Sequence, residues 1–163
     1  MKATFWTIQH IDKWHEFEKS GVLQADKKFI LPYFINAYDW ICDQMKKRIS
    51  NHIDDGIYPI WAWYKYEVDY YRPDLRRSGH LEKGSPGVLI QFEEKMENVL
   101  LTDFIDWHMV LNTSQPTPND YIRWEKIIID EKQKRRIEKN IVQASLWTLT
   151  IDKVKSVKPF VAK

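Results

Sequence analysis

The sequence predicts a mixed α+β fold, in which one compact domain over residues 1–163 packs three to five helices against a mixed or mostly antiparallel sheet. Chain length is the first observation behind this prediction, because 163 residues can bury one sizeable core but not two independent ones. The second is the order of the expected elements, which runs strand, two helices, strands, helices, strands. That order differs from the strict strand–helix alternation of a doubly wound parallel sheet.

The N-terminal third begins with an expected strand and continues with two helices. Residues 3–9 carry aromatic and β-branched side chains on both sides, a pattern typical of a central strand. From residue 10 the apolar spacing becomes helical, and Gly21 is a typical helix stop. A longer helix is expected over residues 29–50, with Pro32 in its first turn and three basic residues in its last.

The middle of the chain has a two-residue period over residues 57–67, which predicts a strand. Strand alternation predicts two groups on opposite sides, with Ile60, Ala62, Tyr64 and Tyr66 on one and Trp61, Trp63 and Lys65 on the other. Two indoles and an amine would therefore share one face. Residues 70–87 are rich in Arg, Gly and Pro and form a long expected loop, and loops of this length often contain binding residues.

The C-terminal half predicts further strands and helices in alternation. Strands are expected over residues 88–93 and 98–101. Asp103 begins an expected helix that Asn112 ends, and Thr117 is the expected N-cap of a helix that continues through Trp124 to Ile128. The remaining expected elements are a charged, solvated stretch over residues 130–139 and closing strands over residues 141–149 and 157–162.

Composition and missing motifs exclude several classes of protein. Hydrophobic residues at 44% and charged residues at 29% describe a soluble globular chain, and no apolar run approaches the roughly 20 residues that span a bilayer. The single cysteine, Cys42, makes no internal disulfide, and the first residues do not resemble a secretory signal, so we expect a cytoplasmic protein without a membrane partner. Five histidines without HExxH or CxxC spacing predict no metal site, and the absence of GxGxxG and P-loop motifs excludes classical dinucleotide and P-loop folds.

Aromatic content is unusual, since the chain contains eight Trp. One candidate ligand-binding group combines aromatic and charged side chains: Trp61, Trp63, Lys65, Arg72, Asp74 and Arg76. Indole faces stack on planar bases while Lys or Arg pairs with phosphate, which predicts binding of a nucleotide or single-stranded nucleic acid. The alternative is structural, with one core Trp, one exposed Trp and a surface ion pair of Asp74 with Arg76 or Arg77.

A second candidate group lies in the expected helix over residues 103–112. Asp103 and His108 are candidates for catalytic proton movement, and Trp107 and Asn112 are candidates for ligand binding. The structural alternative is an N-cap Asp, a core Trp, a hydrogen-bonded His and a C-cap Asn.

Several blocks along the chain match one known family. They are Phe5-Trp6-Thr7-Ile8-Gln9, Trp14, Gly21-Val22-Leu23, Ala37-Tyr38-Asp39-Trp40, Tyr58-Pro59-Ile60-Trp61-Ala62-Trp63, Pro73-Asp74-Leu75-Arg76, Leu100-Leu101-Thr102-Asp103, Trp107-His108, Leu111-Asn112, Trp124-Glu125-Lys126-Ile127 and Gln143-Ala144. Together they resemble a bacterial family known as domain of unknown function 3841. The resemblance covers almost the whole chain and implies no established activity.

The layout of these elements is also similar to that of small ADP-ribosyltransferase-like domains. That resemblance implies NAD as a cofactor, held without a Gly-rich loop between two sheets, with Gln9, Trp63 and Lys65 positioning it. Those enzymes carry a late-strand Glu, where this chain has Gln143-Ala144-Ser145-Leu146. Their first-strand His or Arg is also missing, unless Gln9 or His10 replaces it.

Three functional hypotheses follow from these residues. The first is a binding module that holds a nucleotide or single-stranded nucleic acid in an aromatic-cationic cleft. The second is an NAD-dependent transferase of the ADP-ribosyltransferase-like kind. The third is a regulatory protein whose exposed aromatic residues bind a protein partner.

Overall fold

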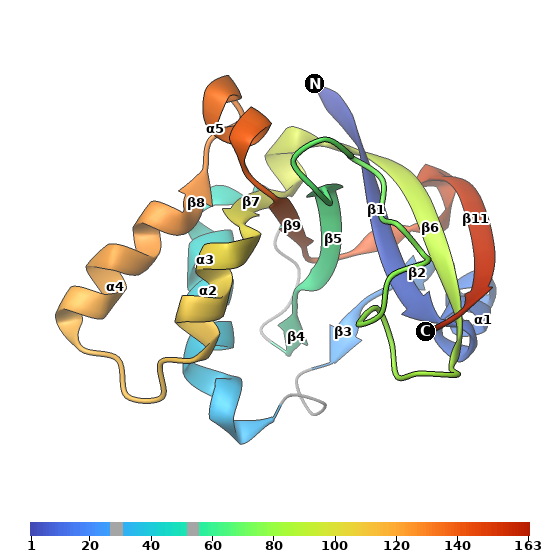
Figure 1. The fold of residues 1–163 in the computed structure, drawn as a ribbon, viewed down its shortest axis with the longest axis horizontal. Helices are drawn as coiled ribbons and strands as arrows, with labels where there is room; N and C mark the ends of the chain where they lie inside the picture. Colours follow the sequence, from blue (N-terminus) through green and yellow to red (C-terminus); the bar gives the residue numbers. More distant parts are fainter. Residues whose placement is uncertain (27–30, 52–55) are drawn as a thin grey trace.

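The computed structural model describes residues 1–26, 31–51 and 56–163, and its centre is a seven-stranded antiparallel sheet (Figure 1). The strands are β1 Lys2–His10, β5 Ile60–Lys65, β6 Pro86–Lys95, β7 Leu100–Asp103, β8 Ile128–Ile129, β9 Val142–Leu146 and β11 Val154–Val161. Their order across the sheet is β11-β6-β1-β5-β9-β7-β8, and each neighbouring pair is antiparallel. The predicted α+β fold is confirmed, and so is the central position of the first strand.

The helices and the minor strands surround this sheet. The helices are α1 Ile11–Ser20, α2 Ile35–Arg48, α3 Phe104–Leu111, α4 Pro118–Trp124 and α5 Lys134–Lys139. Two short strand pairs join β2 Val22–Leu23 with β10 Leu149–Thr150, and β3 Ala25–Asp26 with β4 Ile57–Tyr58. In the described part of the chain, each helix is too short or too polar to cross a lipid bilayer.

Each face of the sheet contributes to its own hydrophobic core. The first core contains buried side chains of α1 and of one sheet face, including Phe5, Phe17 and Phe92. The second core contains side chains of α2, α3 and α4, which lie together at the left of Figure 1, including Ile41, Trp107 and Trp124. Leu100 and Leu101 are adjacent on β7 but belong to different cores, because strand side chains alternate between faces.

Local capping residues explain where several helices begin and end. Gly21 adopts the left-handed conformation with φ 77°, and its N–H donates to the Phe17 carbonyl at the end of α1. The Asp103 carboxylate accepts the Asp106 N–H at the start of α3. Thr117 and Asp120 form a capping box at the start of α4. The predicted caps at Gly21, Asp103 and Thr117 are thus confirmed.

Several predicted boundaries differ from the structure. The helix expected over residues 29–50 has a 3₁₀ turn at Pro32–Phe34 before α2, while residues 29 and 30 lie outside the described residues. The strand expected over residues 98–101 begins two residues later, as β7 Leu100–Asp103, because Met96–Asn98 forms a 3₁₀ turn. The helix expected to continue to Ile128 ends at Trp124, since Ile128 pairs with Thr102 in the sheet.

A β-bulge changes the predicted alternation of β5. Trp63 pairs with Gln143 of β9, but Lys65 pairs with Val142, so one residue of β5 has no counterpart. Trp63 therefore shares a face with Gln143, and Lys65 shares the opposite face with Val142 of the first core. The prediction that Trp61, Trp63 and Lys65 point to the same side is wrong for Lys65.

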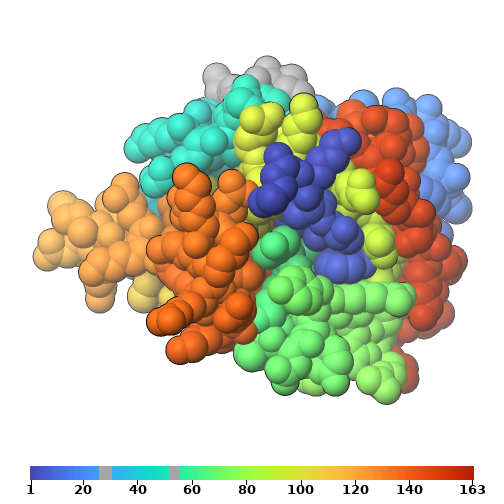
Figure 2. All heavy atoms as spheres, turned by 90° about the horizontal axis from the view of Figure 1, so that it is seen from above, coloured from blue at the N-terminus to red at the C-terminus, as the bar shows by residue number. Residues whose placement is uncertain are grey.

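Residues 66–85 connect β5 to β6 without helix or strand, in agreement with the long loop expected there. The loop begins with a turn in which the Tyr66 N–H donates to the Tyr71 carbonyl. Its far end is attached to the C-terminal residues by two backbone hydrogen bonds. The Gly84 N–H donates to the Ala162 carbonyl, and the Ala162 N–H donates to the Ser85 carbonyl. Figure 2 shows this loop, in green, at the surface beside the N-terminal end of β1.

Candidate functional site

The fold brings several predicted site residues together around one cavity of about 270 Å³. Strands β1, β5 and β9 contribute residues to it, α2 and α3 contribute others, and residues 79–80 of the loop complete it. The side chains that line it include Ile8, Tyr38, Trp61, Trp63, His80, Phe104, Trp107, His108, Leu111 and Gln143. We call this the aromatic cavity. It gathers four of the predicted site residues, Trp61, Trp63, Trp107 and His108.

Aromatic rings pack against one another around this cavity. The Trp61 and Trp107 ring centroids lie 5.0 Å apart, and Trp63 meets Phe104 edge to face at 4.6 Å. Trp107 is buried in the second core, whereas Trp61 and Trp63 are half-buried. Burial raises the pKa of Tyr38, and a hydrogen bond with Trp61 opposes that rise. Trp61 and Trp63 are thus fixed by their neighbours while part of their surface stays exposed.

Gln143 is an unusual polar residue of the cavity. Its side chain is 5% exposed, and its amide nitrogen Nε2 has no hydrogen-bond partner among the described residues. A buried donor without an acceptor costs about 1–3 kcal/mol, so such groups usually have a partner. The signal for Gln143 in the sequence is one amide within the apolar stretch of β9, and the binding prediction did not include it.

Two histidines add further polar atoms to the aromatic cavity. His108 Nδ1 lies 2.9 Å from the Phe104 carbonyl oxygen, and His80 Nε2 lies 2.7 Å from the Asp74 carbonyl oxygen. Because a carbonyl only accepts, each of these ring nitrogens donates a proton. In the neutral rings the acceptor nitrogens are therefore Nε2 of His108 and Nδ1 of His80. His80 was not among the predicted site residues, because its loop position has no periodic signal.

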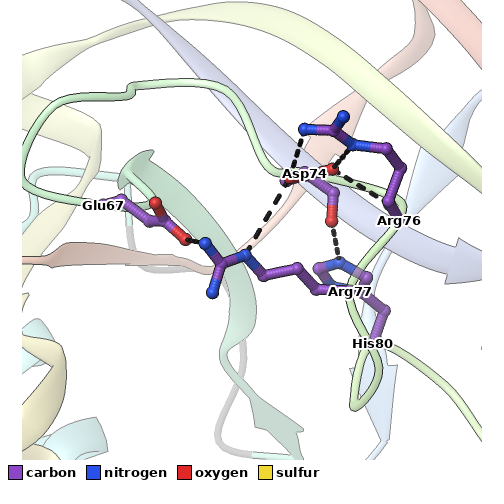
Figure 3. A network of polar contacts seen from close by, with 5 residues as sticks. All are labelled: Glu67, Asp74, Arg76, Arg77 and His80. Carbon is purple, nitrogen blue, oxygen red and sulfur yellow. Dashed lines mark hydrogen bonds and ion pairs between the residues drawn. The ribbon is translucent and has the colours of Figure 1, made fainter.

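Asp74 and Arg76 belong to a charged network that supports the loop next to His80 (Figure 3). Arg76 Nε donates to Asp74 Oδ1 over 2.9 Å, and Arg77 pairs with Glu67 over 2.8 Å. Hydrogen bonds from Arg76 lower the pKa of Asp74 to about 2. The predicted ligand-binding residues Asp74 and Arg76 thus pair with each other, as the structural alternative expected.

Lys65 and Arg72 do not line the aromatic cavity. The Lys65 side chain is 2% exposed, and its ammonium group donates to the carbonyl oxygens of Ile137 and Glu138 over 3.0 and 2.5 Å. Burial lowers the pKa of Lys65, and the nearby charges of Asp69 and Glu138 oppose this. Arg72 is exposed on the loop. The expected cationic side of the cleft is therefore not formed by these residues.

The other predicted site residues lie outside the cavity. Asp103 is buried as the cap of α3, and Asn112 is exposed at the end of the same helix. Gln9 donates to the Thr7 hydroxyl over 2.9 Å and lines a neighbouring cavity of about 590 Å³. That cavity shares Ile8 and Trp61 with the aromatic cavity. The described residues contain no cluster of three or more His, Cys, Asp or Glu that could hold a metal ion.

Comparison with known proteins identifies one similarity. The model of a family described as "Domain of unknown function (DUF3841)" matches residues 4–123. No curated protein and no solved structure matches the chain. The similarity to ADP-ribosyltransferase-like domains expected from the sequence therefore receives no support from solved structures.

Proposed function

The chain belongs to the DUF3841 family, and we propose that this member binds the base of a nucleotide, either free or at an unpaired position of a nucleic-acid strand, in the aromatic cavity. The observation that carries the proposal is the buried amide nitrogen of Gln143, which has no hydrogen-bond partner in the described part of the chain, beside the half-exposed rings of Trp61 and Trp63. A heteroaromatic base offers what both features require, namely a flat face and a hydrogen-bond acceptor at its edge.

The indoles supply the stacking surface for such a base. Stacking of a base on an aromatic side chain is worth about 1–3 kcal/mol and tolerates every base, since each has a π face. Trp61 is held by Trp107 and Trp63 by Phe104, so little side-chain entropy would be lost when a base stacks on them. This rigidity supports binding of a planar ligand.

Polar atoms of the cavity would fix the orientation of the bound base through hydrogen bonds to its edge. Gln143 Nε2 would donate to a carbonyl oxygen or ring nitrogen of the base, which would satisfy the buried donor. His108 Nε2 would accept from an N–H of the same base, because Nδ1 is occupied by the Phe104 carbonyl. A base with both a donor and an acceptor on its edge fits this pair.

Cavity size and charge support a base over a larger charged ligand. Small-molecule pockets usually measure about 300–1,000 Å³, so a volume of about 270 Å³ suits one base better than a complete dinucleotide. Among the described residues that line the cavity, none is a Lys, Arg, Asp or Glu. The phosphate would therefore remain in solvent. ADP-ribosyl transfer, which uses a carboxylate to stabilise the cationic sugar, is less well supported by these residues.

The test is titration of the protein with nucleoside monophosphates and short single-stranded oligonucleotides, with binding measured by the change in tryptophan fluorescence. We expect saturable quenching in the wild type. Trp63→Leu should weaken the affinity by about tenfold or more, because one stacking contact with the base is lost. Trp14→Leu is the matched control, since Trp14 is half-buried on α1 against the first core. No quenching by any nucleotide or oligonucleotide would overturn the proposal. Release of nicotinamide from labelled NAD would favour the transferase instead.

A further inference from the structure

Another cavity, of about 440 Å³, lies between α2 and α4 and shares no lining residue with the aromatic cavity. Both helices lie on the left of Figure 1, and Trp40 of α2 meets Trp124 of α4 with ring centroids 5.5 Å apart. Carboxylates of both helical segments line it, namely Asp39 and Asp43 of α2 and Glu125 just after α4. We call it the acidic cavity.

The acidic cavity has an excess of negative charge. Asp39 and Asp43 lie one helical turn apart and so share a face of α2. Lys47 is the single basic residue among the described lining residues, so two negative charges remain uncompensated. Asp39 accepts the Tyr58 hydroxyl over 3.2 Å. Asp43 and Glu125 form no ion pair with another described residue.

Gln44 gives an independent indication of a ligand. Its side chain is 3% exposed, and its carbonyl oxygen Oε1 has no hydrogen-bond partner among the described residues. This residue lines the acidic cavity one position after Asp43. An unpartnered buried acceptor is costly and calls for a group with N–H or O–H donors. Carboxylates and a carbonyl around one space are matched by a cation that carries several donors.

The remaining side chains favour an organic cation over a metal ion. Trp40 and Tyr121 bring aromatic rings to the cavity, and Ile122 adds an apolar side chain. Aromatic faces attract ammonium groups, whereas Mg²⁺ and Ca²⁺ require a dense shell of oxygen ligands. The described residues contain no cluster of three or more metal-binding side chains. An alkyl chain would contact the rings and Ile122 while its ammonium groups face the carboxylates.

We propose that the acidic cavity binds a small aliphatic diamine, with one ammonium group shared by Asp43 and Gln44 and the other facing Glu125. A dication balances the two uncompensated charges of the cavity, and its N–H donors satisfy the Gln44 carbonyl. This site is independent of base binding, because the two cavities have no lining residue in common.

The experiment is calorimetric titration of the full chain with diaminobutane, with butanediol as the neutral analogue of the same shape. We expect saturable binding of one diamine per chain and no binding of butanediol. Asp43→Asn and Glu125→Gln should each weaken diamine binding by about tenfold, as expected for loss of a charge-assisted hydrogen bond. Asp12→Asn, a change at an exposed carboxylate of α1, should leave it unchanged. Trp63→Leu should also have no effect, which separates this site from the proposed base site.

Three further results would overturn the proposal. The first is equal diamine affinity in the wild type and Asp43→Asn. The second is tighter binding of Mg²⁺ than of diaminobutane, which would indicate an inorganic cation site. The third is binding of a lysine-containing peptide without binding of the free diamine, which would assign the cavity to a protein partner. Circular dichroism of each variant establishes that a loss of binding does not come from unfolding.

Discussion

Trp63 and Lys65 are two residues apart on β5, yet their side chains lie on opposite faces of the sheet. Regular alternation would place them on one face, but the bulge between them adds one residue relative to β9. Trp63 consequently lines the aromatic cavity, and Lys65 reaches the carbonyl oxygens at the end of α5. The cavity is therefore aromatic and polar, without the cationic partner that the sequence predicted.

Removal of the Lys65 ammonium group should affect stability and leave base binding intact. Lys65→Met keeps the aliphatic stem but leaves the carbonyl groups of Ile137 and Glu138 without this donor. We expect the free energy of unfolding to fall by about 1–3 kcal/mol, the usual cost of an unsatisfied buried acceptor. Urea denaturation measures this, with the exposed Lys158→Met as control. A weaker base affinity in folded Lys65→Met would contradict this assignment.

Replacement of Gln143 should separate ligand binding from stability. Gln143→Leu removes a buried amide whose nitrogen has no partner among the described residues, so stability should stay equal or rise. Base affinity should fall by about tenfold, because one hydrogen bond to the ligand is lost. Fluorescence titration and urea denaturation give the two quantities. Gln91→Leu is the matched control, since Gln91 lies in the same row of the sheet opposite Trp6 but outside the cavity. Loss of stability with unchanged affinity would argue against a binding role.

A side chain at Gly87 should destabilise the protein, although the backbone of Gly87 is an ordinary part of β6. A Cβ atom there would lie 2.6 Å from Leu81 Cδ1 and 2.9 Å from Phe160 Cε1. Gly87→Ala should therefore destabilise the protein by about 1–3 kcal/mol through overpacking. Thermal and urea denaturation measure this loss. The double variant Gly87→Ala with Leu81→Ala tests the cause, because a shorter residue 81 should recover part of the loss caused by the closest contact.

Acid should remove the contribution of Asp74 to stability. The pKa of Asp74 is about 2 in the folded protein, against an ordinary value of 3.8, so the folded state binds the proton more weakly than the unfolded chain. Its stabilisation is then fully present above about pH 4 and is lost as the pH falls through about 2. Asp74→Asn should be less stable than the wild type near neutral pH, and this difference should narrow as the pH falls from about 4 towards 2. Urea midpoints across this range test it, and Arg76→Gln should show the same trend. A stability difference that persists unchanged to pH 2 would contradict the linkage.

Local patterns in the sequence predicted most elements of this fold. Gly21, Asp103 and Thr117 act within one turn of the backbone, so their effect on helix ends needs no knowledge of the tertiary structure. Alternation likewise predicted the strand around Trp61 and Trp63. The boundaries that differ, such as those of β7 and β8, depend on pairing with strands distant in the sequence.

The candidate site was only partly predictable for the same reason. Trp61, Trp63, Trp107 and His108 were identified by their residue types, and they do meet in one cavity. Gln143 comes from β9, 80 residues after its strand partner Trp63, and His80 comes from an irregular loop, so no local pattern in the sequence places either beside the indoles. Asp74 and Arg76 pair with each other in the loop, because an ion pair can satisfy such residues as readily as a ligand can.

The amino-acid sequence by itself determined the α+β class, the helix caps, most strands and the family, because these depend on short-range chemistry and on short blocks of residues. Tertiary structure alone decided which side chains face each other. Antiparallel pairing set Gln143 beside Trp63, and one extra residue in β5 turned Lys65 to the other face. A shift of one residue in a strand exchanges the two faces of the sheet, and neither composition nor periodicity records where such a shift occurs.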